Sequence, residues 1–158
     1  MSSSLLHRVL ENFAWRVEAI TPTLDAGRKF RRVDKLAYEV NDTSGTFRRF
    51  WVMWNGSGSD ENVTDGSARV SVHEIELGVI YPTASTRDWH ALQAIVVQDR
   101  HDLISHLQNR NLAGFSTASP STDIGLYTRE RASDDVDRDE LLWVLTLEWR
   151  CTVYEESY

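Results

Sequence analysis

The segment LLWVLTLEWRCTVYEE, residues 141–156, alternates between an apolar and a more polar set of side chains. The apolar set takes every second residue: Leu141, Trp143, Leu145, Leu147, Trp149, Cys151 and Val153. A period of two predicts a β-strand. A strand of fourteen residues already reaches roughly 45 Å at about 3.3 Å per residue, whereas the usual strand has about 5–6 residues and a domain of this size has a radius of gyration near ~15 Å. Part of the strand is therefore expected to protrude or to lie along another subunit.

Periodicity predicts the remaining elements. Apolar residues at three- and four-residue spacing predict helices at residues 3–20 and 85–111. Strands are predicted at residues 47–54, 68–82 and 125–133. The polar stretch NGSGSDENVTDGS predicts a flexible hairpin loop at residues 55–67, and DDVDRD predicts an acidic turn before the last strand. Residues 21–45 are predicted to be irregular, with room for a short strand at Phe30–Val33 or at Ala37–Val40.

The order of elements is helix, strand, strand, helix, strand, strand. This order predicts an α+β fold: an antiparallel sheet built from two long hairpins, with two main helices packed on one face. The 158 residues suit a single domain spanning residues 1–158, long enough to bury its own core.

The charges narrow the class of protein. A net charge of -7 disfavours a main role in gripping nucleic-acid phosphates. Acids gather in SGSDENVTDGS and SDDVDRDE, and bases gather in GRKFRR and at residues 48–49. Such clusters are either solvated turns or complementary patches between copies of the chain. No apolar run approaches the ~18 residues of a membrane span, and the single cysteine points to the cytosol, at least during synthesis.

No constellation of residues predicts a catalytic site, a metal site or a cofactor. Asp102 and His106 have a spacing that can hold a metal, but the sequence marks no third ligand. His73 could act as a base only if a carboxylate oriented it. Cys151 lies on the apolar face of a strand and is predicted to be a buried structural thiol. The stretch NGSGSD lacks the lysine of a phosphate loop and precedes a strand, which excludes that motif.

Six tryptophans are many for this length. A large aromatic core accounts for them, and so does a protein–protein interface, where Trp is enriched as an anchor. Trp51 and Trp54 fall on opposite faces of one predicted strand, so a neighbouring element or subunit is expected to cover at least one of them.

From LLHRVLENFAW through LLWVLTLEWRCTVYEE, the chain resembles the tail terminator (tail-completion) proteins of long-tailed bacteriophages. The resemblance lies in the N-terminal helix, the long hairpin with a polar tip, the central helix and the final hairpin with its long apolar strand. It implies a non-enzymatic virion protein of the tail neck, present in the host cytoplasm during assembly, with no cofactor or metal. It also implies a hexameric ring that caps the tail tube and joins tail to head.

The resemblance implies three partners: further copies of the chain, the tail tube protein and the head–tail connector protein. DNA would pass through the ring without specific binding, and no membrane is involved. An oligomer or partner interface is expected at Arg48, Arg49, Trp51, Trp54, Glu148, Arg150 and Tyr154. A channel-facing or partner-contacting loop is expected at Asp60, Glu61 and Asp65, where carboxylates would repel phosphates and let DNA slide.

Two alternatives remain open. The first is another ring-forming tail or neck subunit, such as a tube protein. The second is a small α+β ligand-binding domain or hydrolase that uses His73 and a neighbouring carboxylate.

Overall fold

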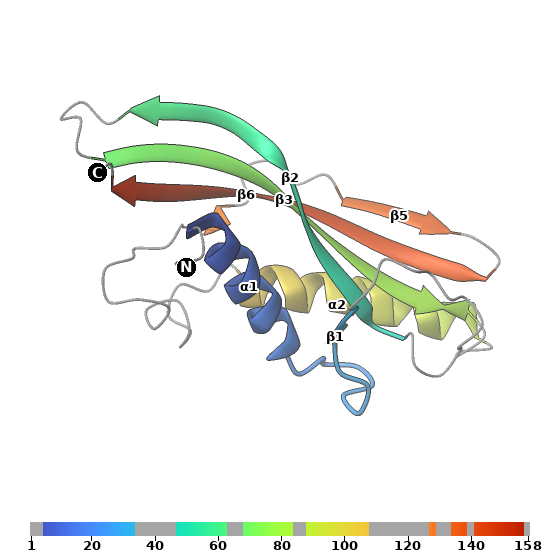
Figure 1. Ribbon diagram of the computed structural model, residues 1–158. Helices are drawn as coiled ribbons and strands as arrows, with labels where there is room; N and C mark the ends of the chain where they lie inside the picture. Colours follow the sequence, from blue (N-terminus) through green and yellow to red (C-terminus); the bar gives the residue numbers. More distant parts are fainter. Residues whose placement is uncertain are drawn as a thin grey trace.

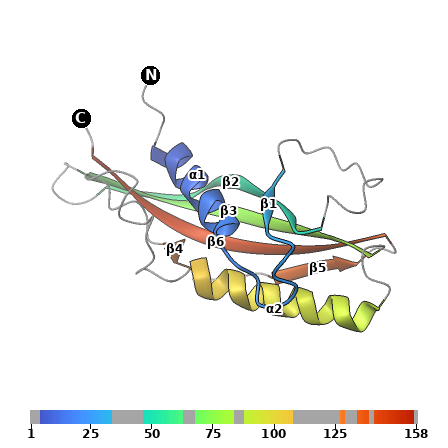
Figure 2. The ribbon, with the colours of Figure 1, turned by 90° about the horizontal axis from the view of Figure 1, so that it is seen from below.

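The computed structural model describes residues 5–33, 47–62, 68–83, 88–107, 127–128, 134–138 and 141–156. This part of the chain contains the helices α1 (Leu5–Glu18) and α2 (Trp89–Leu107), which lie on the same side of a curved sheet (Figures 1 and 2). The strands are β1 (Arg31–Arg32), β2 (Arg49–Asn62), β3 (Ala68–Pro82), β4 (Tyr127–Thr128), β5 (Asp134–Arg138) and β6 (Leu142–Glu156). The predicted α+β fold is confirmed.

The sheet has the strand order β1-β2-β3-β6-β4, and β5 also pairs with β6. Strands β4 and β5 pair with different stretches of β6, so they follow one another along the same edge. Strand β1 is parallel to β2, whereas the other pairs are antiparallel. The sheet is therefore mixed and not purely antiparallel as predicted. The parallel strand is β1, which lies at the first of the two positions that the sequence allowed for a short strand, while the second lies outside the described residues. It is bonded from Arg31 N to Arg48 O and from Val33 N to Phe50 O.

The core lies between the sheet and the helices. Phe50, Val79 and Leu145 are aligned across β2, β3 and β6, and each is fully buried. Helix α1 covers this face with Phe13, whose ring meets Trp149 edge-on at 5.3 Å between centroids. Helix α2 buries Leu92, Ile95, Val96, Asp99, Leu103 and Leu107. The apolar residues spaced three to four apart in both helices thus pack against the apolar residues spaced two apart in the strands, and together they form one core.

Helix α2 begins with a side-chain cap. The Asp88 carboxylate accepts hydrogen bonds from the backbone N–H groups of His90 at 2.9 Å and Ala91 at 3.4 Å. A carboxylate at this position satisfies amides that have no partner within the helix and suits the positive end of the helix dipole. Trp89 is 57% exposed and stacks on His90 instead of entering the core.

Two predicted connections are strands in the structure. Strand β2 runs on to Asn62, so residues 55–62 of the predicted 55–67 loop pair with β3, and residues 63–67 lie outside the described residues. Its register shifts twice between Trp54 and Ser59, where Gly56 takes a φ of 108° that favours glycine. Backbone pairing with a long neighbour overrides the low strand propensity of these residues.

The predicted acidic turn is also a strand. Residues 134–138 form β5, which pairs with β6 from Asp134 opposite Leu147 to Arg138 opposite Trp143. Val136 is partly buried against the core, while its neighbours Asp135 and Asp137 are exposed. One inward valine and an edge position explain how such an acidic segment becomes a strand. Of the predicted strand at residues 125–133, only Tyr127 and Thr128 lie within the described residues.

Neither helix is long and apolar enough to cross a membrane, in so far as the chain is described.

Candidate functional site

Among the described residues, polar or aromatic side chains come together in a buried arginine cluster, in a shallow pocket beside α2, and on the sheet face that no described helix covers. The first is built around Arg48, which is 0% exposed. Its guanidinium forms a two-pronged pair with Asp99 on α2, from Nε to Oδ2 at 2.7 Å and from Nη2 to Oδ1 at 2.9 Å. The remaining donors reach three backbone carbonyls, those of Leu24, Asp25 and Arg28.

This cluster fixes the segment between α1 and β1. The five N–H groups of Arg48 make five hydrogen bonds, so the buried cation is fully satisfied. Its backbone has a φ of 58°, a left-handed conformation that costs a non-glycine residue roughly 1–2 kcal/mol. The hydrogen bonds hold it there. The role of Arg48 is therefore to anchor the irregular segment, since its side chain is closed off from any partner and the expected interface role is wrong.

Asp99 has a second partner, because the Tyr81 hydroxyl donates to its Oδ2 at 2.8 Å. Burial raises the pKa of Asp99, while the hydrogen bonds from Arg48 act in the opposite direction. Burial and the nearby Asp99 charge raise the pKa of Tyr81 well above its ordinary value, so the hydroxyl remains a donor. Asp99 interrupts the row of apolar residues along α2, and this interruption was the one signal in the sequence for a buried polar cluster. The sequence did not indicate that Arg48 is the partner of Asp99.

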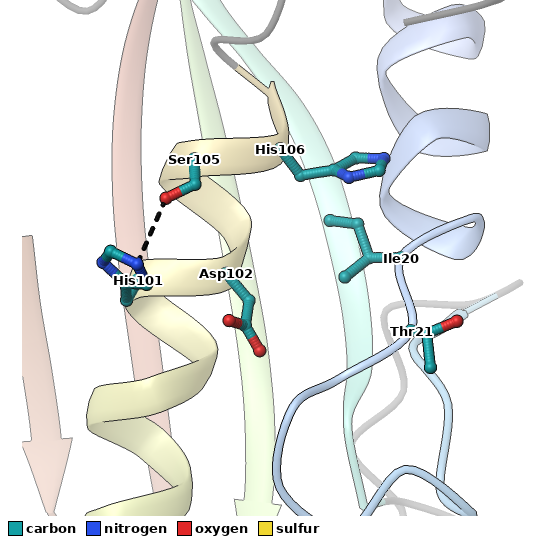
Figure 3. Close-up of a pocket in the computed structure, with 6 residues that line it drawn as sticks. All are labelled: Ile20, Thr21, His101, Asp102, Ser105 and His106. Atoms are coloured by element: carbon teal, nitrogen blue, oxygen red, sulfur yellow. Dashed lines mark hydrogen bonds between the residues drawn. The ribbon is translucent and has the colours of Figure 1, made fainter.

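The pocket lies where the end of α1 meets α2, and its volume is about 280 Å³. It is lined by Ile20, Thr21, His101, Asp102, Ser105 and His106 (Figure 3). His101 and Ser105 lie one turn apart on α2, with 3.5 Å between Nε2 and Oγ. Serine, histidine and aspartate are the residue types of a hydrolase catalytic triad, so their geometry in this pocket decides whether a triad is formed.

Asp102 is already committed elsewhere. Its two oxygens accept hydrogen bonds from the N–H of Thr23 at 2.8 Å, the hydroxyl of Thr23 at 2.9 Å and the Gln98 amide at 2.9 Å. Burial raises the pKa of Asp102, but these hydrogen bonds outweigh it and hold the pKa below its ordinary value. The carboxylate thus ties the Thr23 turn to α2, and the geometry does not form a catalytic triad.

His106 completes the pocket at the last turn of α2. Burial and the positive charge of Arg16 lower its pKa below the ordinary value. The guanidinium of Arg16 donates from Nη2 to the His106 carbonyl at 3.0 Å, which places a cation at the negative end of the helix dipole. The described residues contain no group of three His, Cys, Asp or Glu side chains that could hold a metal ion.

His73, the candidate base, is buried with 8% exposure and lies beside Trp54. The indole N–H of Trp54 donates to its Nδ1 at 3.1 Å. An indole nitrogen only donates, so Nδ1 acts as the acceptor. The histidine therefore fixes a tryptophan that is itself 48% exposed, which favours a positioning role over that of a base.

The third place is the sheet face opposite the helices, here called the outer face. Trp51 lies over Gly78, where its indole ring fills the space that a Cβ would need. Its Nε1 donates to Glu76 at 3.2 Å. Trp51 is half-buried by its own sheet, so the expected cover comes in part from a neighbouring strand, while Met53 beside it is 38% exposed.

The other predicted interface residues are distributed over both faces. Register places Arg49 and Glu148 on the outer face, both half-buried, and Trp54 on the helix side. For Arg150 and Tyr154 the structure describes only the backbone, within β6. Asp60 and Glu61, predicted as loop, belong to β2, and Asp65 lies outside the described residues. The sequence missed Asp135 and Asp137 as outer-face residues, since it assigned them to a turn.

No known protein-family model matches this chain, and no curated protein matches it.

Proposed function

We propose that this chain is a structural subunit of a bacteriophage virion, a tail terminator that forms a ring on the tail tube and joins tail to head. The observation that carries the proposal is the length of the central strands. Strand β3 pairs with β6 from Ala68 opposite Glu156 to Pro82 opposite Leu142, and β2 runs alongside. These strands continue past both helices at the end that holds the C-terminus (Figures 1 and 2).

The strand arm, residues 57–62, 68–72 and 150–156, is longer than the helix-covered core requires. Exposed strands with unpaired edges are a liability in a lone domain. In an assembly, the same arm supplies contact area with neighbouring subunits. Exposed Trp15, Met53 and Trp54 add apolar area of the kind that anchors protein interfaces.

The arm also carries the proposed contact with DNA or with the next ring. Asp60 and Glu61 lie on β2 near its end, and the net charge of the chain is -7. Carboxylates lining a channel repel phosphates and leave DNA free to slide. The proposed partners are further copies in a hexameric ring, the tail tube protein and the head–tail connector protein, in the virion neck after assembly in the host cytoplasm.

The test is the particle formed by the purified wild-type chain over a wide concentration range. Light scattering and negative-stain imaging are expected to find a closed ring with a central channel. A species that stays monomeric at every concentration would contradict the proposal and favour a small ligand-binding domain. In that case the pocket beside α2 would be the place to search for a ligand.

The same images separate a terminator from a tube subunit, the second candidate, which is supported by the same sheet-built architecture. A terminator is expected to stop at one ring or a closed stack of fixed height. A tube subunit is expected to stack into tubes of variable length. A coding sequence that lies between head and tail genes would support either virion role.

A further inference from the structure

The register of the sheet sets opposite charges at opposite edges of the outer face. One row crosses all five positions of the sheet: Arg31 in β1, Arg49 in β2, Ile80 in β3, Val144 in β6 and Asp137 in β5. Residues aligned across neighbouring strands project to the same face. The row therefore begins with two guanidinium groups, crosses two apolar side chains and ends with a carboxylate.

The basic edge of the outer face consists of Lys29, Arg31 and Arg49, and backbone contacts with the buried Arg48 hold it in place. Arg31 donates its backbone N–H to the carbonyl of Arg48, whose side chain binds the preceding residues 24–28. The side chains of Lys29 and Arg31 are exposed. Within the described ranges no carboxylate lies within ion-pair distance of either, whereas Arg32, on the helix side, is bound by Glu11. Two cations are thus presented by an ordered segment.

The acidic edge, Asp135 and Asp137, lies on β5 at the other side of the sheet and carries the opposite charge. Asp135 and Asp137 are exposed on β5, with no cation at ion-pair distance in the part of the chain that is described. Next to them, Glu76 and Glu148 lie directly opposite one another on β3 and β6. The side of the outer face toward β5 thus carries several carboxylates, and the exposed Asp135 and Asp137 are the ones open to a cation.

The two edges cannot satisfy each other within one chain. Arg31 and Asp137 are separated by four strand spacings, roughly 19 Å at about 4.8 Å each. A nucleic acid fits only the basic edge, and a basic protein fits only the acidic edge. A second copy of the chain fits both edges, because its acidic edge can bind the basic edge of the first copy and its basic edge can bind an acidic edge.

We propose that the outer face carries both halves of a head-to-tail contact: the basic edge at Lys29, Arg31 and Arg49 binds the acidic edge at Asp135 and Asp137 of the next copy. This inference rests on the proposed ring function and names its subunit contact. A contact between two different patches repeats from copy to copy and closes when the rotation fits a ring. Trp51 and Met53, on the same strand as Arg49, supply apolar area, while the charges set the orientation.

Charge reversal tests the contact. R31E and D137R each place like charges against one another, and each is expected to weaken assembly by at least about tenfold in concentration. An equimolar mixture of the two variants restores both pairings in alternating copies, so it is expected to recover particles of wild-type mass in light scattering. D135R provides a second acidic-edge variant should D137R disturb its neighbour Arg138, whose guanidinium lies 5.2 Å from the Trp143 ring.

R100E, on the exposed side of α2, changes net charge by the same amount as R31E and is expected to assemble as wild type. Thermal melting checks that each variant is folded. Folded single variants that assemble normally, or a mixture that stays dissociated, overturn the contact. A mixture that stops at a dimer also overturns it, in favour of face-to-face pairing. Wild-type rings that persist in both variants overturn this contact alone, whereas a monomeric wild type overturns the ring function itself.

Discussion

On the helix side of the sheet, Phe50, Val79 and Leu145 stand in one row across three strands, and all are fully buried. One residue further along, the outer face has Trp51, Gly78 and Thr146 in the corresponding row. Helices cover the inner row, and the buried ion pair between Arg48 and Asp99 on this side uses every N–H group of the guanidinium. A second row on the outer face, from Arg31 to Asp137, leaves charges at its two ends. The comparison shows that the same strands bury their inner side chains in the core, which stabilises the fold, while their outer side chains remain available for contact with another molecule.

The largest expected effect comes from breaking the buried pair beneath the inner face. Arg48→Met leaves the Asp99 carboxylate with only the Tyr81 hydroxyl of the donors described above, and three backbone carbonyls without the guanidinium. Removing one partner of a buried ion pair typically costs about 3–5 kcal/mol. Urea denaturation should show a loss of this size. Arg49→Met, one residue away on the outer face, is the matched control and is expected to cost below about 1 kcal/mol. Equal losses in the two variants would contradict the division between the faces.

The next effect compares two neighbours in β6. Leu145 is 0% exposed on the helix side, whereas Thr146 is half-buried on the outer face. Leu145→Ala is expected to lower the free energy of unfolding by about 2–5 kcal/mol, through lost apolar contact and a cavity. Thr146→Ala is expected to change it by no more than about 0.5 kcal/mol. Thermal and urea unfolding measure both. A costly Thr146→Ala would indicate that another part of the chain packs on the outer face.

A smaller effect probes the packing of the outer face itself. In Gly78→Ala the added Cβ meets the indole of Trp51, which must move. Overpacking of this kind typically costs about 1–3 kcal/mol. The double variant Gly78→Ala with Trp51→Ala removes the clash, so its loss should be smaller than the sum of the two single losses. Strict additivity in urea denaturation would argue against the close approach.

The smallest effect concerns pH. The pKa of His106 is lowered from 6.5, so the unfolded chain binds a proton at this ring more readily than the folded protein. The contribution of His106 to the free energy of unfolding should therefore fall as pH decreases below about 6.5. Replacing His106 with Gln removes this contribution and should make the pH dependence shallower between about pH 7 and about pH 5. Urea midpoints measured across that range provide the check, and identical slopes in wild type and variant would contradict it.

Much of the inner face was predictable because burial imposes a period. The alternation in residues 141–156 gave β6, and the three-to-four-residue spacing gave both helices. The prediction was wrong where neighbours decide the structure. Asp135 and Asp137 read as a turn, since acidic residues disfavour strands; they are β5 because β6 offers an edge for pairing. Residues 55–62 are strand for the same reason.

The candidate contact residues followed the same division. Trp51, Trp54 and Glu148 were correctly placed on a strand, because their period is local. Arg48 was assigned to an interface together with Arg49, because basic residues gather at these two positions. Its burial depends on Asp99, 51 residues away, and on carbonyls of a third segment. The spacing of residues within one segment cannot predict a contact between segments that are this far apart in the sequence.

The sequence by itself determined which residues can face a core, and hence the two helices, the long strands and the α+β class. It did so because hydrophobic burial leaves a period within each element. Only the tertiary structure decided the parallel edge strand, the burial of Arg48 and the row from Arg31 to Asp137. The physical reason is that strand register and ion pairing join residues far apart in the chain, and their partners are fixed only once the strands lie side by side.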